Sequence, residues 1–152
     1  MSRTKKILLG VLILLIVIQF IRPARNINGQ VLPTDISKLY SIPQNVQTSL
    51  KTACYDCHSN NTRYPWYVNI QPVGWYLAWH VSEGKEELNF SDFGSYSQRK
   101  QKGKFKSIAK TVQEDEMPLS SYTLIHKDAK LTNEEKAQLI DWAKNYYQAV
   151  SP

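Results

Sequence analysis

The chain has 152 residues, 42% of them hydrophobic, and a formal net charge of +6. This length argues for one compact domain plus a targeting segment. Much of the positive charge flanks the first apolar run, so the rest of the chain is nearly neutral and lacks the dominant basic stripe that nucleic-acid binding requires. We therefore expect no nucleic-acid partner.

An apolar run, ILLGVLILLIVIQFI, begins at Ile7 and follows three basic residues. A positive start before an apolar segment is typical of an export signal. The next residues, RPAR, do not match the A-x-A-like pattern of small residues that signal peptidase requires, and the positive-inside bias places the N-terminus in the cytoplasm. Residues 1–25 are therefore predicted to be an uncleaved transmembrane helix. It would anchor a single-pass protein in the inner membrane, with its C-terminal domain in the periplasm.

The remaining chain divides into a tether and a helical domain. Residues 26–42 contain Pro, Gly and Asn without periodicity, which is typical of a tether. Residues 43–152 are predicted to form the domain, which starts with a helix that presents Cys54 and Cys57 on one face. Further helices are expected over about 73–82, ending at a glycine, about 105–114 and 131–150.

Two features of these later helices bear on function. Thr132 and Glu135 stand in capping-box register at the start of the last helix. Basic residues between Arg99 and Lys110 are expected to form a solvated helix face, with a docking patch for an acidic partner as the alternative. No strand pattern competes, so the fold class is all-α.

The segment TACYDCHSNN, residues 52–61, holds the only two cysteines, and His58 directly follows the second. Two thiols three residues apart on a helix can add to the two vinyl groups of one porphyrin, and the adjacent histidine can ligate the iron. The other ring nitrogen of His58 needs an acceptor, for which we expect a backbone carbonyl in the loop from Pro65 to Pro72.

The same cysteines suit other chemistry. A redox disulfide of the thioredoxin type is expected near a βαβ pattern, which the sequence does not show. A zinc site needs another ligand, such as His80 or His126, and would strain to use Cys57 and His58 together. Haem attachment is therefore favoured over a zinc or disulfide structural module.

A six-coordinate haem needs a second axial ligand. Met117 is favoured, because Pro118 holds the chain extended and can present the thioether, although most methionines simply fill cores. His80 is the alternative distal ligand, whereas His126 is expected to order the loop before the last helix. The aromatic residues between Tyr64 and Trp79 suit a haem wall and an ordinary core equally well.

Several segments occur in a characteristic order: CYDCHSN at 54–60, RYPWY at 63–67, IQPVGWYLAWH at 70–80, LNFSDF at 88–93, EMPLSSY at 116–122, and IHKDAKLT through LIDWA at 125–143. Together they resemble a haem-binding domain family of exported bacterial proteins, often from Bacteroidetes, that is distantly similar to class I cytochromes c. The resemblance implies a cytochrome c-like helical fold around one haem c, attached to Cys54 and Cys57, with His58 as proximal ligand. It suggests Met117 as distal ligand, although the aromatic insert with His80 departs from a typical cytochrome c.

These features predict a membrane-anchored, single-haem electron carrier or relay rather than an enzyme. The alternatives are a haem peroxidase subunit and a haem-based gas or redox sensor. A single CxxCH motif argues against the peroxidase, and the lack of an output domain argues against the sensor. Expected partners are the membrane, the cytochrome c maturation machinery and an unidentified redox protein.

Overall fold

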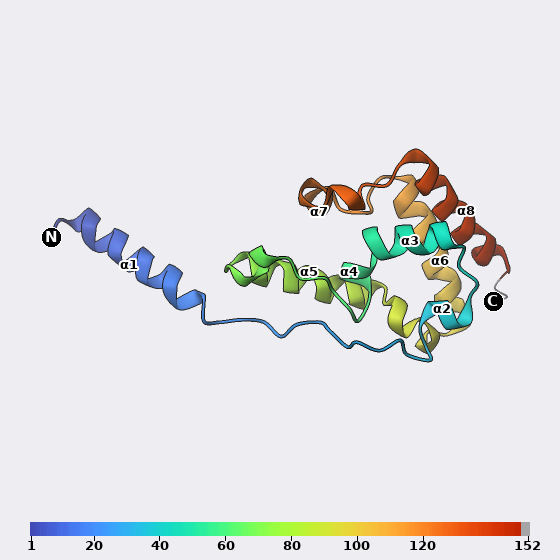
Figure 1. Cartoon of the computed structure of the whole chain (residues 1–152), viewed down its shortest axis with the longest axis horizontal. Helices are drawn as coiled ribbons and strands as arrows, with labels where there is room; N and C mark the ends of the chain where they lie inside the picture. The colour runs from blue at the N-terminus through green and yellow to red at the C-terminus, as the bar shows by residue number, and fades with distance from the viewer. Residues whose placement is uncertain (150–152) are drawn as a thin grey trace.

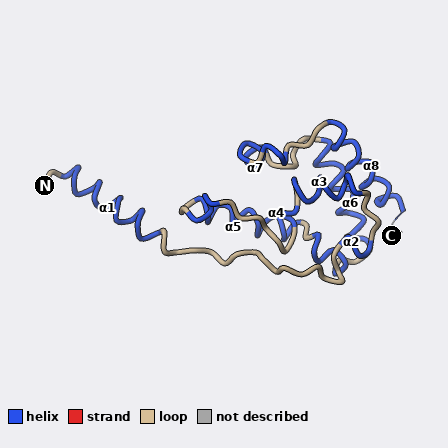
Figure 2. Tube along the Cα trace, viewed as in Figure 1, coloured by secondary structure: helices blue, strands red, loops and turns tan. Residues whose placement is uncertain are grey.

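The computed structural model describes residues 1–149, and its regular structure is helical (Figure 2). Within those residues the β-type pairing is limited to one isolated bridge between Ile27 and Asn61. The all-α prediction is thus confirmed, while Val150 and the last two residues of the predicted domain lie outside the described residues. The elements in chain order are α1 (Arg3–Ile18), α2 (Ile36–Leu39), α3 (Gln44–Ala53), α4 (Tyr55–His58), the 3-10 helix η1 (Trp66–Asn69), α5 (Val73–Glu87), η2 (Phe90–Ser95), α6 (Gln98–Gln113), α7 (Ser120–Ile125), η3 (Lys127–Ala129) and α8 (Asn133–Ala149).

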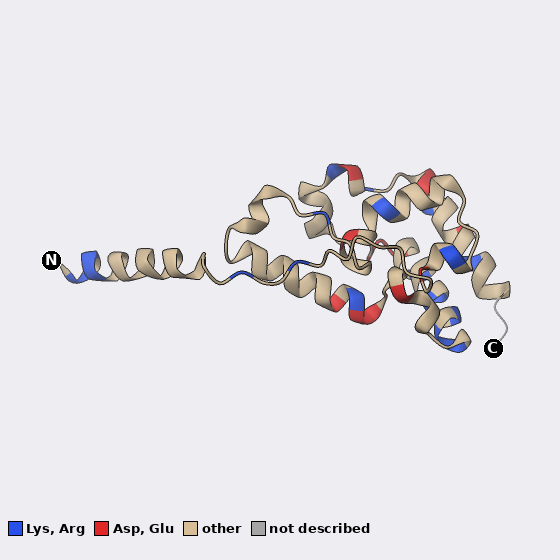
Figure 3. Cartoon of the chain, turned by 60° about the horizontal axis from the view of Figure 1, so that its bottom comes forward, with Lys and Arg blue, Asp and Glu red and all other residues tan. Residues whose placement is uncertain are grey.

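The prediction of an N-terminal transmembrane helix was wrong. Helix α1 has 16 residues, which rise about 24 Å at about 1.5 Å per residue, short of a hydrocarbon core of roughly 30 Å. Among residues 1–149, the structure contains no helix with the length and apolar character needed to cross a membrane. The expected single-pass location in the inner membrane, with a periplasmic domain, is overturned with it. Helix α1 stands apart from the other helices in Figures 1 and 3.

The segment after α1 packs along the domain. Asn26 O accepts from Thr62 N at 3.0 Å, and Asn28 N donates to Asn60 O at 3.0 Å. Further along, Ile36 in α2 is fully buried in the core. Residues 26–42, for which we expected a tether, therefore contribute contacts and one core side chain to the domain.

The core lies where α3, α6 and α8 meet. Helix α6 packs against α8, and α3 also contacts α8. The fully buried side chains at its centre include three phenylalanines and two leucines: Leu50, Phe90, Phe93, Phe105 and Leu139. Helix α8 begins with the predicted capping box, because Thr132 N donates to Glu135 Oε2 at 2.8 Å and Glu135 N donates to Thr132 Oγ1 at 3.2 Å.

Two predicted helix boundaries were wrong. Helix α5 does not end at Gly84 but continues to Glu87, and α6 begins at Gln98 rather than near residue 105. Ser97 caps α6, since its hydroxyl accepts from Lys100 N at 3.4 Å. Gly84 lies inside α5, where the helix packs closely against Cys57.

Candidate functional site

The two cysteines lie at a bend between α3 and α4. Cys54 is the residue at the bend, with φ −125° and ψ −41°, and Cys57 lies in α4. The prediction of one uninterrupted helix under both cysteines was therefore wrong. The bend leaves the local backbone satisfied, because Cys54 N donates to Leu50 O at 2.9 Å and His58 N donates to Cys54 O at 2.9 Å.

His58 is held by hydrogen bonds from one ring nitrogen. Its Nδ1 lies 2.7 Å from Gly84 O and 3.0 Å from Leu88 O. Both carbonyls can only accept, so Nδ1 carries the proton and Nε2 keeps its lone pair. Removal from water also lowers the pKa of His58, which favours the neutral imidazole that ligates metals. The acceptor therefore comes from the end of α5 and not from the expected Pro65–Pro72 loop.

Gly84 allows this contact between α4 and α5. A Cβ atom at residue 84 would lie 2.7 Å from Cys57 O and 3.1 Å from the Cβ of Cys57. Any larger residue would push α5 away from α4, and the carbonyl that holds His58 would move with it. A glycine inside α5 therefore sets the distance between the cysteine motif and the helix that orients its histidine.

Two adjoining cavities of about 210 and 170 Å³ meet at His58. Cys54, His58 and Met117 line both cavities, and Cys57 and His80 line the smaller one. The structure thus brings together all five residues singled out from the sequence as thioether sites or axial ligands. We refer to the two cavities together as the cleft.

The two thiols are free and protonated. Both cysteines are unpaired thiols, and burial raises the pKa of Cys54 to about 12 and that of Cys57 to about 11. Nucleophilic redox cysteines have the opposite property, a lowered pKa. Within residues 1–149, no group of three or more His, Cys, Asp or Glu side chains is arranged to hold a metal ion.

The two distal candidates reach the cleft from different elements. Met117 lies between α6 and α7, and its N–H donates to Thr111 O at 3.2 Å. His80 lies on α5, where its Nδ1 is 3.1 Å from Tyr76 O, so its Nε2 is also left with a lone pair. His126 is elsewhere: its Nε2 is 2.6 Å from Tyr67 Oη, and its ring stacks on that of Tyr122.

A buried carboxylate ties the cysteine motif to α7. Asp56, between the two cysteines, is 5% exposed and forms an ion pair with Arg63 at 3.2 Å. Tyr122, from α7, donates its hydroxyl to Asp56 Oδ2 at 2.6 Å and lines the smaller cavity. Asp56 and Tyr122 therefore fix α7 across the cleft from α4.

The aromatic side chains between Tyr64 and Trp79 neither line the cleft nor belong to the buried core. Trp66 is 75% exposed, and Tyr76 and Trp79 are also exposed. The residues that surround the cleft and that sequence reasoning missed are instead Gly84, Glu87, Leu88, Lys104 and Tyr122. The periodicity of α6, with Ile108 and Val112 four residues apart, was the one available signal that this helix faces the site.

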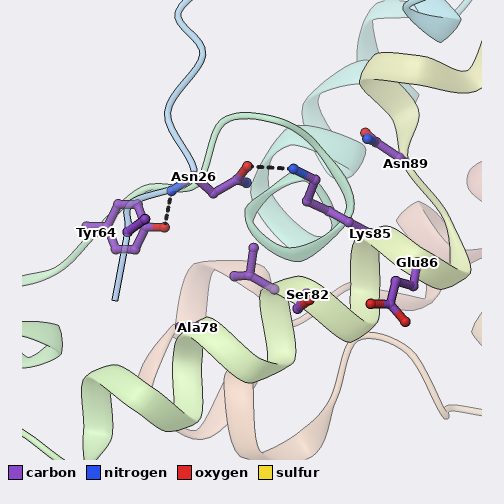
Figure 4. Close-up of a pocket in the computed structure, with 9 residues that line it drawn as sticks. Asn26, Tyr64, Ala78, Ser82, Lys85, Glu86 and Asn89 are labelled. Carbon is purple, nitrogen blue, oxygen red and sulfur yellow. Dashed lines mark hydrogen bonds between the residues drawn. The ribbon is translucent and has the colours of Figure 1, made fainter. Parts of the chain in front are cut away.

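A separate pocket of about 380 Å³ lies on the other face of α5 (Figure 4). Its polar groups bond to one another: Lys85 Nζ donates to Asn26 Oδ1 at 2.8 Å, and Asn26 N donates to Tyr64 Oη at 2.7 Å. This pocket contains no cysteine, histidine or methionine in its lining. We therefore assign the functional site to the cleft at His58.

Comparison with known proteins identifies a family for the chain. Residues 13–145 match the model of a family described as a haem-binding domain. No curated protein and no solved structure matches the chain, so the expected likeness to cytochrome c folds has no support from either comparison. The family match covers most of the sequence, including every residue of the cleft. The chain belongs to the haem-binding domain family.

Proposed function

We propose that the protein carries one haem c as an electron carrier, with thioether bonds at Cys54 and Cys57, His58 as proximal ligand and Met117 as distal ligand. The observation that carries the proposal is the state of His58. Its Nδ1–H is held by two carbonyls, and its lone pair on Nε2 lies at a cleft that both cysteines and Met117 also line.

The lining of the cleft suits a porphyrin. Apolar side chains from α3, α6 and α8 surround the larger cavity, among them Leu50, Ile108, Val112 and Leu139. The two cavities together reach the lower end of the roughly 300–1,000 Å³ range of small-molecule sites. An apolar cleft with a few polar atoms at its ligand positions is what a flat, mostly apolar ring requires.

The two cysteines are in the state that attachment needs. Each S–H can add across one vinyl double bond, which forms a C–S bond and leaves the thiol hydrogen on the neighbouring vinyl carbon. Atoms and electrons balance in this addition without an oxidant. Cys54 at the bend and Cys57 in α4 both line the smaller cavity. We expect the cytochrome c maturation machinery to catalyse the step.

Two protein ligands would leave the iron no open position for a substrate. When bound, the haem iron supplies a one-electron couple between its ferrous and ferric states. His58 and Met117 would hold both axial positions in either state, and apolar neighbours would exclude water. The protein would then exchange electrons with a partner protein and transform no substrate.

The attachment is tested by making the full chain in cells that contain a cytochrome c maturation system. We expect a haem-stained band on denaturing gels, and we expect Cys54→Ala with Cys57→Ala to abolish it. Lys85→Ala, on the opposite face of α5, is the control and should keep the stain. A colourless wild-type chain, or a stain that survives loss of both cysteines, contradicts covalent attachment.

The distal ligand is tested by the ferrous absorption spectrum with and without carbon monoxide. We expect the wild-type spectrum to be low-spin and unchanged by the gas, Met117→Ala to become high-spin and reactive, and His80→Ala to resemble the wild type. The reverse pattern in the two variants assigns the distal role to His80. Binding of carbon monoxide by the wild type contradicts the electron carrier and favours the sensor or peroxidase alternatives.

A further inference from the structure

We infer that Lys104 binds a propionate carboxylate of the haem, so that α6 recognises the acidic edge of the porphyrin. The inference rests on the proposed haem site, and it adds a residue that neither the cysteine motif nor the family match assigns. It begins from the difference between Lys104 and the other basic residues of the same helix.

Lys104 is the cation of α6 that faces the cleft. Its side chain is 19% exposed, compared with 66% for Lys110, and it lines the larger cavity together with His58. Lys102 and Lys106 lie over the ring of Tyr147 instead, at 5.6 and 5.9 Å from its centre. The basic run predicted to be a solvated face thus has one member turned inward.

The position of Lys104 along the cleft matches the layout of the cofactor. Cys57 lines only the smaller cavity and Lys104 lines only the larger one, whereas Cys54 and His58 line both. In haem, the vinyl groups and the propionates occupy different edges of the ring, on either side of the iron. With the vinyl groups at the cysteines and the iron at His58, the propionates would extend toward α6.

The ammonium group of Lys104 has only a weak partner at this end of the cleft. The present partner of Lys104 is Glu87, at 3.7 Å between Nζ and Oε2, and the Glu87 side chain is 84% exposed. A long ion pair with an exposed partner contributes little. A propionate that is held beside Lys104 by the rest of the ring would form a stronger, charge-assisted hydrogen bond. Ser107 and Thr111, in the lining of the same cavity, add hydroxyl groups on that side.

The test uses the full chain with Cys54→Ala and Cys57→Ala, in which haem cannot form thioether bonds. Haem and haem dimethyl ester, which lacks the carboxylate charges, are titrated into this background and followed by absorption. We expect Lys104→Met to weaken haem binding about tenfold or more while leaving the affinity for the ester unchanged. Lys106→Met is the matched control and should alter neither affinity, and Lys104→Arg should restore the preference for haem.

Equal weakening of both pigments, or of neither, overturns the inference. If the background binds neither pigment, the covalently loaded chain decides the matter through its midpoint potential as a function of pH. There, Lys104→Met should raise the pKa of the propionate, because the carboxylate has lost its cation. An unchanged pH profile overturns the assignment of Lys104.

Failure of the Lys104 inference can be distinguished from failure of the proposed function. A chain isolated without covalent haem contradicts thioether attachment, yet the titration in the double-alanine background still tests Lys104. A covalently loaded chain in which Lys104→Met behaves as wild type contradicts the role of Lys104 alone.

Discussion

Helix α5 separates two pockets of different character. On one face, Ser82 and Lys85 line a pocket of about 380 Å³ (Figure 4). On the other face, His80 and Gly84 line a cavity of about 170 Å³ that adjoins His58. The pocket and the two cavities of the cleft together have about the same volume, so volume alone does not distinguish the two faces.

The difference lies in where the polar atoms find their partners. In the pocket on the Lys85 face, Asn26 bonds to both Tyr64 and Lys85, which leaves little for a ligand to satisfy. At the cleft, the hydrogen bonds recorded for the His58 ring use Nδ1 alone. A site is therefore better recognised by a ligand atom that the protein has oriented and left available than by empty space.

The largest effect should come from removing Nε2 of His58. His58→Ala deletes the proposed proximal ligand, so we expect the low-spin haem spectrum to be lost even if the thioether bonds form. Lys85→Ala removes the central donor of the other pocket and should leave the spectrum unchanged. Absorption spectra of the two purified variants check this, and an unaltered His58→Ala spectrum would show that the comparison assigns the site to the wrong face.

A second prediction concerns the glycine on the cleft face of α5. Gly84→Ala places a Cβ against Cys57 O, which forces the helices apart, and we expect a loss of about 3 kcal/mol in the free energy of unfolding. Gly103→Ala is the matched control, because a Cβ at that position in α6 has no atom within 4 Å. It should stabilise the chain by about 0.5–1 kcal/mol through helix propensity. Urea unfolding of the haem-free chain measures both, and equal effects at the two positions contradict the close approach of α4 and α5.

Loss of the hydrogen bond between Tyr122 and Asp56 should have a smaller effect. Tyr122→Phe removes one donor from the buried carboxylate of Asp56, which keeps its ion pair with Arg63. We expect a cost of about 1–2 kcal/mol in the free energy of unfolding and easier access of carbon monoxide to the ferrous haem. Tyr76→Phe, at an exposed tyrosine, should change neither quantity. No difference between the two variants would indicate that Asp56 does not hold α7 in place.

The smallest expected effect is a pH dependence of the free energy of unfolding of the haem-free chain. Burial lowers the pKa of His58 below its ordinary 6.5 in the folded state. Between the lowered value and 6.5 the unfolded chain binds a proton that the folded chain does not, so stability falls as pH drops below about 6.5 and levels off below the lowered pKa. Urea unfolding between pH 7 and 5 measures this loss, and His58→Gln should reduce it. An identical pH profile in the variant contradicts a buried, neutral His58.

The sequence predicted the residues that line the cleft better than the residues that hold them in position. Spacing and chemistry were enough to single out Cys54, Cys57, His58 and Met117, which the structure places around one cleft, because few residue types suit the tasks proposed for them. The acceptor for His58 could not be predicted, since Gly84 O lies 26 residues away and its approach depends on how α5 packs against α4. Contacts of this kind are set by tertiary packing and leave no local pattern.

The fold shows the same division between local and long-range information. The capping box at Thr132 is a local signal, and the structure confirms it. The burial of Ile36 and the inward turn of Lys104 depend on neighbours far along the chain, so composition alone did not predict either of them. The apolar N-terminal run was misjudged for another reason: its helix ends at Ile18, and Gln19 bonds to the backbone of Gln71 in the domain.

The carbonyls that hold His58 also carry an electronic consequence. Gly84 is in the last turn of α5, where the partial negative charge of the helix dipole accumulates. An imidazole that donates its N–H to this end gains electron density on the opposite nitrogen and becomes a stronger base. Any iron bound there would be stabilised in its more oxidised state, in opposition to the apolar cleft and the thioether of Met117. A change in backbone position at the junction of α4 and α5 would therefore change the reduction potential of an iron bound at His58.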